Sequence, residues 1–301
     1  RLSGLDRYAT ASATAEYAYG TATKAIIASG DNYADALTGS AFSGAITAPL
    51  LLTNKDALPA VTAAALGRML GANKTVYVLG GEAAVSAGVV TTLTGLGYVV
   101  TRVSGADRYA TAAAVAAKIK SLSTVGTLYG KITCILASGQ GYADALSVGP
   151  LAHKNIMPIL LTEPNTLTAA TSAAITATAC TQVMIVGGTS AVSAAVATAV
   201  DALTGVNVIR VSGADRYATS VAIANKAWAS AATGGLAWAK THIAIARGDS
   251  YADGLAASQL GQKTSVTPLL LVQADMVPVV VNAAIAGKAA TLTHIRVVGG
   301  L

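Results

Sequence analysis

Hydrophobic residues along this chain gather in short runs that are separated by longer, alanine-rich stretches. Each run ends in Gly, Ser or Thr, and the stretch that follows it has the length of a helix. Short β-branched runs that alternate with helices are typical of βαβ units, whose strands form a mostly parallel sheet. Because helices cover both faces of such a sheet, its strands are continuously apolar, as they are here. The first runs are KAIIASG at 24–30, PLLLT at 49–53, TVYVLGG at 75–81 and YVVTRVSG at 98–105.

The succession of runs occurs three times, because four strings return at nearly constant spacing. Such self-similarity indicates tandem copies of one unit, and we expect each copy to be a small three-layer α/β sandwich of about four strands. The spacing predicts repeats at residues 1–101, 102–209 and 210–301, and the third is expected to be C-terminally incomplete because it stops after its double glycine. The strings are RLSGLDRYAT at 1–10 with RVSGADRYAT at 102–111 and 210–219; ASGDNYADAL at 28–37, ASGQGYADAL at 137–146 and ARGDSYADGL at 246–255; APLLLT at 48–53, MPILLT at 157–162 and TPLLLV at 267–272; and VYVLGG at 76–81, VMIVGG at 183–188 and IRVVGG at 295–300.

All four strings stand where a predicted strand passes into a loop or a helix. In a parallel α/β sheet the loops after the strands meet at one edge, and open sheets bind ligands there. The strings also begin helices, so their aspartates are expected to cap helix N-termini or to interact with the helix dipole, and their double glycines to turn the chain. The residues given these structural roles are Asp6, Asp107, Asp215, Asp35, Asp144, Asp253, Gly81, Gly188 and Gly300.

Arginine and tyrosine are concentrated in the same strings. Six of the nine arginines lie in the three copies of R-x-S-G-x-D-R, and six of the eleven tyrosines lie in the RYAT and YAD strings, which surface charge alone does not explain. The fork of an arginine matches a phosphate or a carboxylate, so a ligand-binding role is one interpretation. Contact between neighbouring repeats is the other, and the sequence leaves both open.

Composition and charge narrow the class of partner. The chain is 53% hydrophobic and 11% charged, with a net charge of +6, which favours an anionic partner. It has no dense basic stripe or nucleic-acid-reading motif, so a negatively charged polymer fits better than nucleic acid. No run of about 20 apolar residues predicts a membrane span. No signal peptide is visible, so either the chain was never secreted or the peptide was removed.

Catalytic, metal and cofactor sites are not expected. The three histidines occupy unrelated places in the repeats, and no Ser-His-Asp or Cys-His arrangement recurs. A Mg²⁺ or Ca²⁺ site in every repeat is disfavoured, because Gln140 replaces the second carboxylate that Asp31 and Asp249 provide in the other two. The double glycines lack the remainder of a phosphate-binding motif. The histidines are His153, His242 and His294.

The two cysteines, Cys134 and Cys180, do not recur in the other repeats. We interpret them as incidental buried thiols. A disulfide within the middle repeat is the open alternative.

Together the strings closely resemble the cell-wall-binding repeat type 2 family of Gram-positive surface proteins. The resemblance covers all three repeats. It implies three tandem Toprim-like, Rossmann-like α/β units with mostly parallel sheets, packed as a pseudo-threefold assembly. It also implies that the modules anchor exported proteins non-covalently to an anionic cell-wall polymer. The family's Pro-Ile-Leu-Leu motif, implicated in anchoring, matches residues 158–161.

We therefore expect a secreted, non-enzymatic module at the cell wall. Its partner would be an anionic glycopolymer, either teichoic-acid-like or a secondary wall polysaccharide, bound at the strand-end face without a cofactor. One alternative is a surface-layer or filament subunit that contacts neighbouring copies of itself, and a remote one is a cell-wall hydrolase. The buried character of the PLLL and PILL strings predicts that they belong to the core. The candidate polymer-binding residues are Arg7, Arg108, Arg216, Arg1, Arg102, Arg210, Tyr33, Tyr142 and Tyr251.

Overall fold

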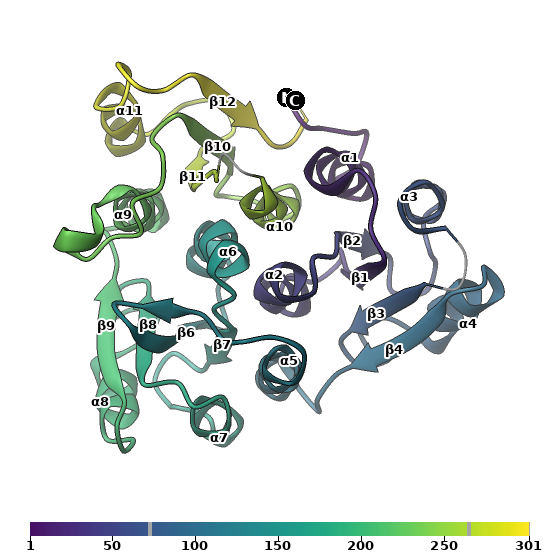
Figure 1. The fold of residues 1–301 in the computed structure, drawn as a ribbon, viewed down its shortest axis with the longest axis horizontal. Coiled ribbons are helices and arrows are strands. Elements are labelled where there is room, and N and C mark those ends of the chain that lie inside the picture. The colour runs from purple at the N-terminus through teal and green to yellow at the C-terminus, as the bar shows by residue number, and fades with distance from the viewer. Residues whose placement is uncertain (72–73, 264–265, 301) are drawn as a thin grey trace.

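The computed structural model of this chain describes residues 1–71, 74–263 and 266–300. Three β-sheets lie around a common centre, each flanked by helices (Figure 1). The predicted fold class is confirmed, because the chain forms three α/β units whose sheets are mostly parallel. Leu301, the last residue of the predicted third repeat, lies outside the described residues.

The first sheet has four parallel strands in the order β2-β1-β3-β4. Its strands and the helices around them are α1 (Arg7–Tyr19), β1 (Lys24–Ser29), α2 (Ala34–Ile46), β2 (Leu50–Thr53), α3 (Ala60–Leu70), β3 (Thr75–Leu79), α4 (Ala87–Gly95) and β4 (Val99–Val103).

The second sheet has five strands in the order β5-β6-β8-β9, with β7 also paired to β6, and only the short β5 is antiparallel to its neighbour in the described residues. This part of the chain consists of α5 (Arg108–Leu122), β5 (Thr127–Leu128), β6 (Lys131–Ser138), α6 (Ala143–Asn155), β7 (Ile159–Thr162), α7 (Ala169–Ala177), β8 (Gln182–Val186), α8 (Ala194–Asp201) and β9 (Asn207–Val211).

The third sheet has three strands in the order β11-β10-β12. Its elements are α9 (Arg216–Trp228), the 3₁₀ turn η1 (Ala231–Thr233), β10 (His242–Arg247), α10 (Gly254–Ala257), the 3₁₀ turn η2 (Ser258–Gln262), β11 (Leu269–Val272), α11 (Val279–Ala286) and β12 (His294–Val297).

Each sheet ends on a strand that leads into the next repeat. β4 pairs with β3 and β9 pairs with β8, and these strands contain Arg102 and Arg210. In the third sheet the start of the chain takes this place, because Leu2 forms a parallel bridge with Val298 beyond β12. The three units thus form a closed ring, and the chain ends lie side by side (Figure 1). The repeat boundaries after residues 101 and 209 follow the sequence repeat and fall inside β4 and β9, so they stay a prediction.

Burial divides the strands of the first sheet between two cores. Alternate side chains such as Ile26 and Leu52 point into one large core that continues through all three units. The intervening ones, such as Ile27 and Leu51, join a second core beneath α3 and α4. The PLLL and PILL strings are confirmed as core, because Leu51 and Leu160 are each 0% exposed.

The interpretation of the cysteines as free thiols is wrong. Cys134 in β6 and Cys180 after α7 form a disulfide, with Cα atoms 5.8 Å apart. Both residues are buried, since α7 returns the chain to the strand that pairs with β6. The bond closes a segment of the middle repeat, and the other two repeats have no cysteine.

Among the described residues, no helix is both long and apolar enough to cross a lipid bilayer.

Candidate functional site

The string S-G-x-D-R-Y-A-T builds the same helix start in each repeat. Asp107 has an extended backbone, and its carboxylate accepts a hydrogen bond from the backbone amide of Ala110 at 2.7 Å. This bond caps the N-terminus of α5. The amide of Gly105 donates to the Thr111 hydroxyl at 3.0 Å, and a Cβ on this glycine would lie 2.4 Å from Ala110. Asp6 and Asp215 cap α1 and α9 in the same way. Most letters of the repeated string therefore serve the turn itself.

The arginine of each string joins two repeats. Nη1 of Arg108 donates to the carbonyl of Gly139 in its own repeat and to the Tyr33 hydroxyl of the preceding repeat, the latter at 3.3 Å. Its guanidinium carbon lies 5.7 Å from the centre of the Tyr33 ring, within cation–π range. The equivalent contacts of the other two arginines are Arg7 with Gly30 and Tyr251, and Arg216 with Gly248 and Tyr142.

The three tyrosines meet on the pseudo-threefold axis. Tyr33, Tyr142 and Tyr251 pack against one another with ring centroids 5.5–5.6 Å apart. Tyr33 and Tyr142 are the N-cap residues of α2 and α6, Tyr251 lies shortly before α10, and all three are half-buried. We call the three tyrosines and their three arginines the Tyr–Arg cluster. It holds the three repeats together at the strand-end face.

A second set of arginines binds the double-glycine turns. Arg102 donates to the carbonyl of Gly80 at 2.6 Å, and Arg210 donates to those of Gly187 and Val192. Arg1 makes the equivalent bonds to the carbonyls of Gly299 and Gly300, which closes the ring at the chain ends.

A half-buried aspartate lies beside each double glycine. Asp35 and Asp144 stand in the first turns of α2 and α6, where burial raises the pKa of both carboxyls and nearby arginines act against this. The first glycine of each pair makes room for the carboxyl. A Cβ on Gly80 or Gly187 would lie 2.2 or 2.3 Å from the carboxylate oxygen, and both residues have φ above +90°. In the third repeat Asp253 approaches Gly299.

Sequence reasoning singled out the second glycine of each pair instead. Gly81, Gly188 and Gly300 have negative φ, and a Cβ on Gly81 would meet open space. The first glycines, Gly80 and Gly187, were missed because a G-G string alone does not tell which residue takes the left-handed conformation. Only the fold shows that the first glycine is the one that faces the aspartate of YAD.

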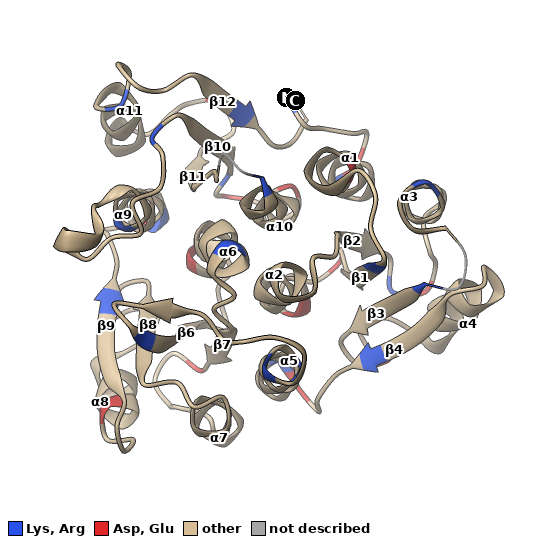
Figure 2. Cartoon of the chain, in the orientation of Figure 1, with Lys and Arg blue, Asp and Glu red and all other residues tan. Residues whose placement is uncertain are grey.

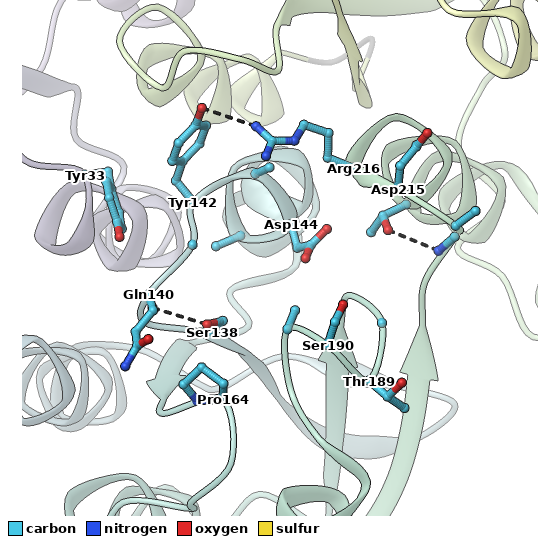
Figure 3. A pocket seen from close by; sticks show the side chains of 18 residues that line it. Tyr33, Ser138, Gln140, Tyr142, Asp144, Pro164, Thr189, Ser190, Asp215 and Arg216 are labelled. Carbon is cyan, nitrogen blue, oxygen red and sulfur yellow. Dashed lines mark hydrogen bonds between the residues drawn. The ribbon is translucent and has the colours of Figure 1, made fainter.

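Figure 3 shows a cleft at the strand-end face, a pocket of about 720 Å³ between the middle and third repeats. Loops after β6, β7 and β8 line it together with the start of α9. Its walls present hydroxyl groups, an amide, aromatic rings, one guanidinium, and the carboxyl groups of Asp144 and Asp215. The labelled lining residues are Tyr33, Ser138, Gln140, Tyr142, Asp144, Pro164, Thr189, Ser190, Asp215 and Arg216.

The loops after β1, β6 and β10 differ in charge. Asp31 accepts the Tyr8 hydroxyl at 2.7 Å, and Asp249 forms a salt bridge with Arg247 at 2.9 Å. Gln140, their counterpart in the middle repeat, is exposed and neutral. At this position the middle repeat therefore has a neutral amide where the other two have a carboxylate.

The remaining charges do not form a metal centre of the usual kind. Among the described residues there is no group of three or more His, Cys, Asp or Glu side chains arranged to hold a metal ion. Charged residues are scattered over the elements rather than gathered on one of them (Figure 2). The three histidines stand at different positions of the repeat, but parallel pairing puts His242 beside His294.

Comparison with known families finds a match in each of the three repeats. The model for cell wall binding domain 2 (CWB2) matches residues 1–90, 102–197 and 210–301. Over 270 residues the chain is 32% identical to the N-acetylmuramoyl-L-alanine amidase LytC of Bacillus subtilis, covering 90% of this chain and 49% of that protein. It is 27% identical over 278 residues to the amidase enhancer of the same organism, covering 92% and 35%. The chain thus spans about half or less of the length of these relatives.

Two solved structures share the fold. Cwp8 from Clostridium difficile has a TM-score of 0.79 and 27% identity, covering 99% of this chain and 49% of that one. Cwp6 from the same organism has a TM-score of 0.83 and 24% identity, covering 99% and 45%.

Proposed function

We propose that this chain, which belongs to the cell wall binding domain 2 family, holds an exported protein non-covalently at the cell wall by binding an anionic glycopolymer. The observation that carries the proposal is the match of the family model to all three repeats. A teichoic-acid-like chain or a secondary wall polysaccharide has the required chemistry, since both repeat an anionic group along a hydroxyl-rich backbone. The net charge of +6 favours such a partner.

The strand-end face is the proposed binding surface. Arg7, Arg108 and Arg216 make their described hydrogen bonds through one guanidinium nitrogen each, so further N–H donors remain for an anionic group. The cleft beside Arg216 supplies hydroxyl and amide partners for sugar units. Three such surfaces on one chain would engage one polymer together, which raises the overall affinity through effective concentration.

The PILL string supports this surface from below. Residues 159–161 are at most 1% exposed, so a polymer has no access to them in the folded protein. We propose that the string serves anchoring by holding the strands whose ends form the clefts.

We further propose that this chain is not itself catalytic. The name of LytC assigns an amidase activity to that protein, but this chain matches only 49% of its length. A separate region would then carry out the hydrolysis, and the present chain would place it on its substrate.

A pull-down on purified Gram-positive walls tests the proposal. Binding is expected to intact walls, to fall after their anionic polymers are stripped, and to fall with rising salt because exposed charge pairs are screened over about 8 Å at physiological ionic strength. The variant Arg68→Gln, which alters only a surface ion pair with Glu16, is the matched control. Equal binding to stripped walls would contradict the proposal. If the purified protein formed ordered sheets without polymer, the surface-layer alternative would be favoured. If it released fragments from the walls, the hydrolase alternative would be favoured.

A further inference from the structure

The three seams between repeats use the same pair of positions. At each seam the helix that begins one repeat contacts the preceding repeat, and at the closing seam α1 contacts the third repeat (Figure 1). One position lies on this helix, ten residues after the arginine of the D-R-Y string. The other is the second residue of the double-glycine string, on a strand of the preceding repeat. The helix positions hold Tyr17, Lys118 and Lys226, and the strand positions hold Tyr77, Met184 and Arg296.

At the first two seams the helix supplies a cation and the strand does not. Nζ of Lys118 in α5 lies 5.8 Å from the centre of the Tyr77 ring in β3, within cation–π range. At the second seam Met184 of β8 is buried and uncharged, and Lys226 of α9 donates to the Tyr129 hydroxyl instead. Both lysines therefore meet neutral groups.

The closing seam has the two kinds of side chain exchanged. Arg296 of β12 supplies the cation, and Tyr17 of α1 supplies the ring. Nε of Arg296 donates to the Tyr17 hydroxyl at 2.9 Å, and the guanidinium carbon lies 5.3 Å from the ring centre. Lys263, also in the third repeat, places Nζ 4.5 Å from the centre of the same ring. The salt bridges of the described residues involve neither cation, so both rely on the tyrosine of α1.

Arginine is a costly residue at this strand position. Tyr77 and Met184 are buried at the equivalent positions of the other two sheets. Nη1 of Arg296 is buried and has no hydrogen-bond partner among the described residues, and an unpaired buried donor lowers stability. A methionine, as in β8, would avoid this cost. The arginine is therefore better explained by a choice of partner than by the stability of its own sheet.

We propose that Arg296 is a specificity determinant that selects α1, among three homologous helices, as the partner of the third sheet and thereby directs closure of the ring. The Tyr17 ring and hydroxyl accept the guanidinium. A helix like α5 or α9 would bring a lysine ammonium to the same place, and two like charges without a carboxylate between them repel. Such a device acts against a wrong helix of the same chain and against one from a second copy. It combines attraction to the right partner with repulsion of the wrong ones.

The variant Tyr17→Lys, which gives α1 the residue of α5 and α9, tests the proposal. We expect its melting temperature to fall by about 3–6 °C. Well below that temperature, exchange of the Leu2 and Gly299 amide hydrogens should accelerate by roughly tenfold or more. These amides bond across the closing seam, Leu2 to the Val297 carbonyl and Gly299 to the Leu2 carbonyl, so their exchange reports on ring closure.

Compensation by the strand residue separates selectivity from simple packing. Arg296→Met copies the second seam and removes the repulsion, so in this background Tyr17→Lys should shift the melting temperature by less than about 2 °C and leave the exchange rates unchanged. The double variant Tyr17→Lys/Arg296→Tyr copies the first seam and should likewise restore closure. The comparison holds even if Tyr17→Lys alone does not fold.

Two results would overturn the proposal. One is that Tyr17→Lys has the same effect in the Arg296→Met background as in the wild type, because the tyrosine would then matter for packing alone. The other is that Tyr17→Lys alters neither the melting temperature nor the exchange at the seam, because a lysine would then be accepted beside the arginine.

Discussion

Replacing Arg108 by Gln is expected to destabilise the protein, because this side chain links two repeats. Arg108 donates to the Gly139 carbonyl and stands over the Tyr33 ring, and a glutamine is too short to make both contacts. A hydrogen bond from a charged group is worth about 1.5–3 kcal/mol. A cation–π contact at a partly exposed site adds about 0.5–1 kcal/mol. The free energy of unfolding should therefore fall by about 2–4 kcal/mol.

Thermal unfolding followed by circular dichroism measures this loss. For a chain of this size the melting temperature should drop by roughly 3–6 °C. Arg68→Gln is again the control, because its partner Glu16 is exposed and such surface pairs are worth about 0–1 kcal/mol. Tyr33→Leu should resemble Arg108→Gln, since it removes the other half of the same contact.

The same variants distinguish a structural arginine from a ligand-binding one. Wall binding is measured well below the melting temperature of each variant, so that loss of fold cannot imitate loss of affinity. An ordinary surface substitution changes the free energy of unfolding by no more than about 0.5 kcal/mol. If Arg108→Gln changes it by no more than this, the proposed link between the repeats is refuted. Loss of wall binding in that stable variant would then assign the arginine to the polymer alone.

Three further predictions concern the core and the middle repeat. Leu160→Ala should cost about 2–5 kcal/mol in denaturant unfolding through the cavity it leaves, with wall binding retained while the variant is folded; unchanged stability would contradict its place in the core. Replacing Cys134 and Cys180 by Ala should lower the free energy of unfolding by about 2–4 kcal/mol, because the disulfide spans 46 residues, and a variant as stable as the wild type would mean that the bond does not form. Burial lowers the pKa of His153 to about 3, so the unfolded chain binds its proton first and stability should fall by about 1 kcal/mol per pH unit as pH drops below 6.5. In His153→Gln this component of the pH dependence should vanish from unfolding curves, and an unaltered dependence would assign the acid sensitivity to other groups.

Local features of the site could be predicted from the sequence. An aspartate that caps a helix interacts with an amide three residues later, so Asp107 and Ala110 are visible in one string. The strand-end location of the strings followed from the alternation of apolar runs with helices. Both inferences depend only on neighbours along the chain.

Contacts between distant residues could not be predicted in this way. Arg108 and Tyr33 are 75 positions apart, and nothing in either string tells which tyrosine an arginine meets. Each arginine meets the preceding repeat because the repeats pack as a ring. This arrangement is not visible in the sequence, so ligand binding and contact between repeats both stayed open. His242 and His294 are a similar case, because they become neighbours only through strand register.

The bridge between Leu2 and Val298 has a consequence for how many repeats such a chain can have. In an open array of repeats the outermost copies each lack a neighbour and need special capping sequences, and copies are added or lost without disturbing the rest. Here each copy has two neighbours and the three tyrosines fill the axis. A fourth copy would have no place at that axis, and removal of one would leave two tyrosines and two arginines without partners. The number three is thus set by closure of the ring, so evolution would have to gain or lose these modules as whole trios.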